Sequence, residues 1–367
     1  MMIIIEAIII IYLATLSIML YRIVIEYRKK RVLKSYPFIS FIIPVHNNEA
    51  NVGKTIKSVH ESYDNFEMFV IDDCSSDNTY KTLKKLRKQY KFHLLCNKKN
   101  IGKSESVNLA ARMARGKILF IVDSDMIMNK PLTEDVIARI NGKTVLACGS
   151  CKIKESDLLS EMQNMEFNVF NFTQWGNNGL KKHTPFGGCM AVRRDAFVKV
   201  GGFSKSFITE DINLTLKLQN AGWKTETSFY YVVTAPASTH KMWAKQQLRW
   251  VVGQTENIIE YSRMTWDKPV TELFMVSFSL VSVWALISLV MGIFHQSLNG
   301  VLEALAYSVI SLPFIVPELT ELKKVYKVFY IIPFFMFYWP ILSVISLLGI
   351  IKGVVGYRKT KEGQRAW

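Results

Sequence analysis

Cysteine is scarce in this sequence of 367 residues, and histidine is hardly more common. The five cysteines, Cys74, Cys96, Cys148, Cys151 and Cys189, are odd in number and thinly spread, which argues against a secreted disulfide framework and favours a reduced compartment. The pair at 148 and 151 has CxxC spacing, but no second cysteine pair accompanies it. Six scattered histidines without a close pair likewise offer no zinc cage.

Acidic residues are outnumbered, because 30 Asp and Glu stand against 46 Lys and Arg and give a net charge of +16. Such a basic chain suits an anionic partner, which can be a nucleic acid, an anionic lipid leaflet or an anionic substrate. Half of the residues are hydrophobic and 21% are charged, a composition that excludes a disordered protein. It leaves room for both a water-soluble domain and apolar segments.

Two common phosphate-binding motifs are missing. No GxGxxG follows the first expected strand, so a dinucleotide-binding fold would lack its phosphate loop. The run Asn100-Ile-Gly-Lys-Ser104 imitates the end of a P-loop, but Asn97 stands where that pattern requires glycine. The sequence therefore disfavours a P-loop ATPase, and another kind of phosphate-handling site has to be considered.

Long apolar runs lie at both ends of the chain. Residues 1–27 predict a membrane-spanning helix, and the basic residues directly after it reverse the order found in a cleaved signal peptide. The region 270–351 contains two runs long enough to span, at 270–294 and 328–351, and a shorter one at 301–316. We therefore expect two or three crossings in this region.

The positive-inside rule places the N-terminus outside and residue 28 onward in the cytoplasm. Two C-terminal crossings keep the basic tail, 352–367, in the cytoplasm but expel Lys323, Lys324 and Lys327, whereas three crossings expel the tail. Both topologies stay open. In either case we expect an integral membrane protein with a cytoplasmic central domain.

Between the apolar ends, residues 38–240 are typical of a soluble α/β domain, because short runs rich in Ile, Val and Phe alternate with polar stretches of helix length. The order predicts a mixed, mostly parallel sheet covered on both faces, with ligands bound beyond the carboxyl ends of its strands. Residues 241–268 form an amphipathic region before the membrane. Expected strands are 38–45, 68–72, 93–97, 118–122 and 145–148, and expected helices are 51–63, 78–89 and 104–115.

Acidic side chains follow two of the expected strands. Asp123 and Asp125 come after the run 118–122, and alternation in an extended chain points both carboxylates the same way. Such a pair can hold Mg²⁺ or Mn²⁺ that bridges a diphosphate, although a turn after a strand also explains the motif. Asp73 follows the second strand, where an Asx turn is the alternative.

Two further polar groups lie later in the chain. Glu210 and Asp211 precede an amphipathic stretch, so they fit the N-terminus of a helix, and a deprotonated Asp there can also serve as a general base. Gln246, Arg249 and Trp250 precede the membrane region, where an interfacial helix with a snorkelling arginine is the alternative explanation.

The order of these groups resembles that of the membrane-integrated family 2 glycosyltransferases. The resemblance covers about residues 38–260 and is strongest to the processive polysaccharide synthases of the cellulose, chitin, hyaluronan and poly-N-acetylglucosamine type. The run His46-Asn47-Asn48-Glu49 departs from the family, whose acid usually stands one position earlier. The motifs that carry the resemblance are Ile43-Pro44-Val-His-Asn, Val70-Ile-Asp-Asp73, Gly102-Lys103, Asp123-Ser-Asp125, Thr209-Glu-Asp211 and Gln246-x-x-Arg249-Trp250.

The resemblance implies a GT-A fold that binds a nucleotide sugar, usually a UDP-sugar, on the cytoplasmic face. It implies that Asp211 takes the proton from the acceptor hydroxyl, and that in-line attack converts an α-linked donor into a β-linkage. It also implies three groups of site residues: Pro44, Asp73, Lys103, Asp123 and Arg249 at the donor, Asp125 with Asp123 at Mg²⁺ or Mn²⁺, and Glu210, Gln246 and Trp250 at the acceptor and in closing the site.

Three classes of function compete. The leading hypothesis is an inverting, processive enzyme that extends a β-linked polysaccharide and passes it across the membrane. The alternative is a single transfer onto a lipid acceptor of the ceramide or polyprenyl-phosphate type. A nucleic-acid-binding membrane protein would explain the charge but not the clustered acids. The expected partners are thus a nucleotide-sugar donor, a growing glycan or lipid acceptor and the bilayer, without nucleic acid. No motif encodes the sugar, the linkage or the oligomeric state.

Overall fold

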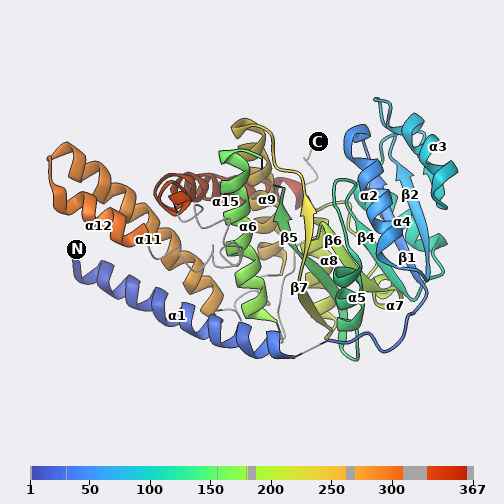
Figure 1. Cartoon of the computed structure of the whole chain (residues 1–367), viewed down its shortest axis with the longest axis horizontal. Coiled ribbons are helices and arrows are strands. Elements are labelled where there is room, and N and C mark those ends of the chain that lie inside the picture. Colours follow the sequence, from blue (N-terminus) through green and yellow to red (C-terminus); the bar gives the residue numbers. More distant parts are fainter. Residues whose placement is uncertain are drawn as a thin grey trace. The chain divides into compact units, whose positions relative to one another are not determined.

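The computed structural model describes residues 2–29, 31–154, 156–178, 180, 187–261, 269–308 and 329–361. The chain divides into two compact units (Figure 1). The sheet unit consists of Glu26–Lys152 and Asn178–Ala235, and the helical unit consists of Met1–Ile25, Ile153–Asn177 and Pro236–Trp367. Each unit is described separately below.

A seven-stranded sheet in the order β3-β2-β1-β4-β6-β5-β7 forms the centre of the sheet unit. β1 is parallel to β2 and β4, and β2 is parallel to β3, whereas β6 is antiparallel to both β4 and β5. The expected mixed, mostly parallel sheet is therefore confirmed. The strands are β1 (Ile39–Val45), β2 (Phe66–Asp72), β3 (His93–Cys96), β4 (Ile118–Val122), β5 (Thr144–Ile153), β6 (Cys189–Arg193) and β7 (Lys224–Thr234).

Every residue of the central strands β1 and β4 is buried. This explains why they are continuous apolar runs rather than alternating ones, as expected for a sheet covered on both faces. One face packs Ile42 and Ile121 against Val107 and Leu214. The helices of this unit are α2 (Glu49–Ser62), α3 (Thr79–Gln89), α4 (Lys103–Met113), α5 (Lys130–Arg139), α7 (Arg194–Lys199) and α8 (Glu210–Asn220).

Long helices make up the helical unit, and three segments of it are long and apolar enough to cross a membrane: Ile5–Arg28, Leu273–Phe294 and Ile331–Tyr357. They agree with the runs expected at 1–27, 270–294 and 328–351. The shorter run at 301–316 is described as far as Ser308, and its remainder lies outside the described residues together with the lysines at 323, 324 and 327. The helices are α1 (Met2–Arg28), α6 (Leu158–Asn177), α9 (His240–Glu260), α11 (Pro269–Phe294), α12 (Leu298–Ser308), α14 (Ile331–Pro333), the π-helix η3 (Phe334–Tyr338) and α15 (Trp339–Lys361).

A buried carboxyl group joins three elements of the helical unit. Glu166 on α6 accepts hydrogen bonds from Trp243 Nε1 on α9, at 3.3 Å, and from the Tyr338 hydroxyl on η3. Burial raises the pKa of Glu166 to about 7, and these hydrogen bonds oppose the rise. α9 also packs closely on α15, because a Cβ built at Gly349 would lie 2.7 Å from Val251 Cγ1. The helix that carries Gln246, Arg249 and Trp250 is therefore fixed within its own unit.

The domain boundaries expected from the sequence stay a prediction. The helix α6 lies inside the expected soluble stretch 38–240, yet it groups with the helical unit. Polar side chains such as Asn164 and Asn168 are buried along α6. In the sequence, such polar residues look the same as those of an ordinary surface helix. For this reason periodicity alone did not separate α6 from the sheet unit.

Candidate functional site

One basic and two acidic side chains meet at the carboxyl ends of the parallel strands. Lys103 Nζ lies 2.7 Å from Asp123 Oδ1 and 2.8 Å from Glu210 Oε1. Lys103 is the first residue of α4, Asp123 directly follows β4, and Glu210 is the first residue of α8. The preceding Gly102 has a φ of +83°, a conformation that glycine adopts without the strain of a side chain. Residues far apart in the sequence thus form one charged cluster.

Asp211 lies beside this cluster and is held by a backbone group. Its Oδ2 accepts a hydrogen bond from Gly187 N at 2.9 Å. A Cβ built on Gly187 would lie 2.1 Å from Asp211 Cβ, so any larger residue here would force the carboxylate or the backbone to move. The α8 N-terminus carries both Glu210 and Asp211, as the sequence predicts, and its N-cap residue Thr209 makes no side-chain cap hydrogen bond.

The electrostatics of the cluster favour a bound cation. Burial by itself lowers the pKa of the Lys103 ammonium, but Asp123, Glu210 and Asp211 outweigh burial and hold that pKa well above its ordinary value. Burial raises the pKa of Asp123 to about 6, with Lys103 opposing the rise and Asp125 adding to it. Burial and then Glu210 raise the pKa of Asp211, and Lys103 opposes them. The carboxylates are therefore crowded, and Lys103 balances part of their charge.

The segment after β4 is a turn, so the expected extended continuation through Asp125 is wrong. Met126 N donates to Asp123 O at 3.1 Å, which closes the turn. Asp125 Oδ2 instead accepts from Thr234 Oγ1 at 3.1 Å. The turn is held from α2, since Thr55 Oγ1 donates to Ser124 O at 2.7 Å. Both carboxylates still lie at the strand end, but hydrogen bonds from α2 and β7 place them, not strand alternation.

Asp73 organises the loop that precedes Lys103. Its Oδ1 accepts from Asn97 Nδ2 at 2.8 Å and from Ile101 N at 2.9 Å, and its Oδ2 accepts from Gly102 N at 2.8 Å. The side chain is buried, and both carboxylate oxygens are engaged. The contact of Asp73 with a donor stays a prediction, while the structure shows that this residue shapes the approach to α4.

The remaining expected residues are Pro44 in the sheet unit and three residues of α9 in the helical unit. Pro44 is a buried residue of β1, opposite Ile71 of β2 and beyond the last residue of β1 that pairs with β4. A proline is tolerated there because no ladder hydrogen bond to β4 is lost. Gln246, Arg249 and Trp250 lie on α9 in the helical unit, where the Trp250 ring meets Phe167 edge-on at 6.1 Å. Their roles at a sugar donor or acceptor stay predictions.

A divalent cation fits the chemistry of the cluster. In the described part of the chain, no three His, Cys, Asp or Glu side chains are grouped to hold a metal. Mg²⁺ and Mn²⁺ sites of enzymes that handle phosphates, however, use one or two carboxylates and complete the coordination with substrate oxygens. Asp123 and Asp125 would supply two such carboxylates, and the Lys103 ammonium shows that this edge accommodates positive charge.

Sequence reasoning missed the pair Gly187 and Gly188. A Cβ on Gly188 would lie 2.2 Å from Met126 Cε, and Gly188 O accepts from Asp123 N at 2.9 Å. These glycines therefore pack against both the turn after β4 and Asp211. A signal was present, because a Gly-Gly pair directly precedes the strand that begins at Cys189. Close backbone approach is the usual reason for such glycines.

Comparisons with known proteins concern the family and the fold. Residues 40–201 match the family model "Glycosyl transferase family 2". A β-monoglucosyldiacylglycerol synthase of Nostoc sp. is 26% identical over 295 residues, which are 72% of this chain and 60% of that protein. A poly-β-1,6-N-acetyl-D-glucosamine synthase of Staphylococcus aureus is 24% identical over 229 residues, 60% of this chain and 55% of that protein. The chain thus spans less than two thirds of the length of these relatives.

A solved structure shows a similar fold over almost the whole chain. The mannosyltransferase PcManGT of Pyrobaculum calidifontis, in complex with GDP-Man and Mn²⁺, superposes with a TM-score of 0.61 at 16% sequence identity, covering 95% of this chain and 99% of that one. At this identity the likeness concerns the fold. Together with the family match, it shows that this chain carries a family 2 glycosyltransferase domain with a GT-A fold.

Proposed function

We propose that the protein is an inverting glycosyltransferase that takes a sugar from a nucleotide-sugar donor, a UDP-sugar first of all, and passes it to a hydroxyl group at the membrane. The observation that carries the proposal is the position of Asp211. It is held by Gly187 N next to the cluster of Lys103, Asp123 and Glu210, at the edge of the sheet where ligands of such folds bind.

The donor diphosphate would lie at the charged cluster. The Lys103 ammonium is a compact cation, which suits phosphate oxygens, and it begins a helix whose N-terminus favours negative charge. Asp123 and Asp125 would hold Mg²⁺ or Mn²⁺, which when bound takes up the charge of the departing nucleoside diphosphate. Lys103 pairs with Asp123 and Glu210, so its ammonium already stands where phosphate charge would be placed.

Asp211 would act as the general base. The Gly187 N–H holds Oδ2 of its carboxylate, and the carboxylate would accept a proton from the acceptor hydroxyl. The raised pKa of Asp211 makes it a stronger base than an exposed aspartate. Because the hydroxyl oxygen attacks the anomeric carbon from the side opposite the leaving diphosphate, an α-linked donor gives a β-linked product.

The acceptor we favour is a membrane lipid that receives one sugar. The relative named for a glycolipid product covers 72% of this chain, against 60% for the relative named for a polysaccharide. Extension of a β-linked polysaccharide is the second candidate, supported by the poly-β-1,6-N-acetyl-D-glucosamine synthase. The three apolar segments would hold the protein in the bilayer, and the basic residues after α1 would place the sheet unit in the cytoplasm.

Sizing the product separates the two acceptors. The purified chain would be incubated in lipid nanodiscs with a labelled UDP-sugar and Mn²⁺, and the label would be followed by lipid extraction and by gel filtration. We expect an extractable lipid that carries one sugar. Label in a water-soluble chain of many sugars would show that the protein extends a polymer and does not transfer one sugar to a lipid.

Donor binding should weaken in acid. Asp123 has a pKa of about 6, and protonation removes the charge that Lys103 and the cation need, so donor affinity should fall as the pH drops through about 6. The measurement is UDP-sugar affinity from pH 5 to 8 in an Asp211→Asn background, which keeps the titration of Asp211 out of the curve. Donor affinity that stays constant down to pH 5 would show that the pKa of the Asp123 carboxyl is not raised.

Gly187→Ala should slow sugar transfer by about 100-fold, because displacing a catalytic group by an ångström has an effect of this order. The new Cβ would lie 2.1 Å from Asp211 Cβ and 2.5 Å from Oδ2. Single-turnover rates with saturating donor measure the effect. Gly53→Ala is the matched control, since a Cβ there would meet its first neighbour at 3.7 Å. Equal rates in both variants would show that Gly187 does not position the base.

A further inference from the structure

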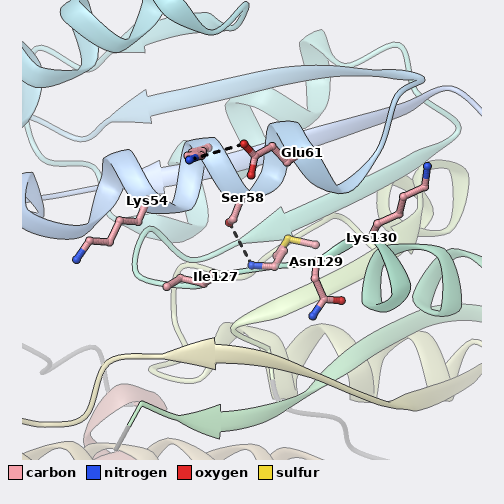
Figure 2. A pocket seen from close by; sticks show the side chains of 8 residues that line it. Lys54, Ser58, Glu61, Ile127, Asn129 and Lys130 are labelled. Atoms are coloured by element: carbon pink, nitrogen blue, oxygen red, sulfur yellow. Dashed lines mark hydrogen bonds and ion pairs between the residues drawn. The ribbon is translucent and has the colours of Figure 1, made fainter. Parts of the chain in front are cut away.

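The described residues contain a groove on the sheet unit that none of the predicted site residues lines. Its volume is about 400 Å³, within the range of small-molecule sites. One wall is the α2 face that carries Lys54, Lys57, Ser58 and Glu61, and the other is the segment from Ile127 to Lys130 that leads into α5 (Figure 2). Three lysines and one glutamate line it, so its net charge is +2.

The ion pairs at the groove are weak and exchangeable. Lys57 Nζ lies 3.9 Å from Glu61 Oε1, and Lys130 Nζ lies 3.6 Å from Asp64 Oδ2, with every one of these side chains more than half exposed. Exposed pairs of this kind contribute little to stability. Among the described residues, Lys54 makes no ion pair. An incoming anion therefore has little to displace.

The rest of the lining is suited to an organic phosphate. α5 begins at Lys130; the Asn129 side chain accepts from Leu132 N at 3.0 Å and Pro131 has no N–H, so this helix adds only its dipole to the field of the lysines. The floor is partly apolar: Met128 is buried, and Ile127 is 37% exposed. In Figure 2, Lys54 and Lys130 stand toward opposite ends of the groove, with Ser58 and Ile127 between them. A bare phosphate ion would fill little of this space.

We propose that this groove binds a phosphate group on a small organic carrier, separately from the donor site. The phosphate lies in the positive field of the lysines that line the groove, and the carrier covers Ile127 and the aliphatic lysine stems. Two sources share this chemistry: the phosphoglycerol headgroup of an anionic lipid and a soluble organic phosphate.

Occupation of the groove would reach the candidate catalytic edge through the chain. Ile127 follows the turn that contains Asp123 and Asp125, and it pairs with Val233 of β7 through backbone hydrogen bonds of 2.8 and 3.0 Å. The next residue, Thr234, donates to Asp125 Oδ2. A ligand on Ile127 therefore touches the same segment that holds the carboxylates. This coupling goes beyond the proposed transfer reaction and does not depend on it.

Hydrogen exchange of the full chain in neutral detergent tests the proposal. The probes are glycerol 3-phosphate and short-chain dihexanoyl phosphatidylglycerol below its micelle concentration. We expect either probe to protect the amides of 49–64 and 127–133 without protecting 97–103 or 209–211. Protection by both probes indicates the phosphate group alone, and protection by the lipid alone indicates a headgroup with its attached chains.

The double variant Lys54→Gln/Lys130→Gln should weaken the apparent affinity of the effective probe by about tenfold, because removal of both ammonium groups lowers the positive potential of the groove. Both side chains are exposed, so the fold should persist. Lys84→Gln/Lys88→Gln on α3 removes the same charge from another exposed surface and should leave the affinity unchanged. Absence of protection with both probes, or equal affinity in the two double variants, would overturn the proposal, whatever the outcome for sugar transfer.

Discussion

Asp211→Asn should lower the single-turnover rate of sugar transfer by roughly 10²–10⁴ while leaving the affinity for the donor nearly unchanged. The amide cannot take the proton of the acceptor hydroxyl. It keeps the shape of the side chain, and its oxygen can still accept the hydrogen bond from Gly187 N that is 2.9 Å long in the native protein. The loss should therefore appear in the chemical step and not in the stability of the fold.

The control for this variant is Asp195→Asn, which removes an exposed acid that pairs with Arg193 at the start of α7. Its rate should stay at the level of the unaltered protein. If the two variants transfer sugar equally fast, Asp211 is a helix N-terminal acid and not the base. If Asp211→Asn loses donor affinity and regains its rate at saturating donor, Asp211 belongs to the donor site instead.

Removal of divalent metal should abolish transfer, and Asp125→Ala should weaken metal-supported donor binding. The reason is that the protein supplies at most two carboxylates to the cation, Asp123 and Asp125, so loss of one leaves little protein coordination. UDP-sugar affinity with and without Mn²⁺ measures the effect. Protein stability should change little, because the residue is a turn residue whose carboxylate accepts one hydrogen bond, from Thr234.

Asp64→Ala serves as the matched control for the metal prediction. The Asp64 side chain is 89% exposed and pairs weakly with Lys130. Its donor affinity should respond to Mn²⁺ as that of the unaltered protein does. Full turnover in EDTA, or an unchanged metal response in Asp125→Ala, would assign the Asp-Ser-Asp motif to the structural turn that Met126 N closes on Asp123 O.

Apolar runs predict five of the seven strands, because burial on both faces leaves a strong local signal, whereas β6 and β7 were not expected. The strand at Ile118–Val122 begins and ends where the sequence predicts. The strand at Thr144–Ile153 is longer than the expected 145–148 and includes the polar residue Ser150. Ser150 can be buried in the strand because its hydroxyl donates a hydrogen bond to Ser228 O at 2.6 Å. A hydrogen bond to a residue 78 positions away cannot be predicted from local hydropathy.

The acids of the site are predictable for a similar reason. Asp123 and Asp211 stand at the ends of recognisable elements, and parallel strands bring such ends to one edge. What surrounds them is not local. The pairing of Lys103 with Glu210 joins two helices more than 100 residues apart in sequence, and the approach of Gly187 to Asp211 depends on the tertiary fold.

The assignment of α6 to the helical unit has the same origin. Its buried asparagines look like surface residues until the elements around them are known, and the partners of Glu166, Trp243 and Tyr338, lie up to 172 positions away in sequence. The glutamine, arginine and tryptophan of α9 share this unit. Their predicted part in closing the site would therefore involve residues from both units.

The most direct measurement of the central claim is sugar transfer itself. The purified full chain in nanodiscs would be given a panel of labelled α-linked UDP- and GDP-sugars with Mn²⁺ or Mg²⁺, and the anomeric configuration of the product would be read by NMR. We predict that at least one donor gives a β-linked product, and that Asp211→Asn reduces its formation at least 100-fold. No transfer from any donor, an α-linked product, or equal product from the Asp211→Asn variant would contradict the account.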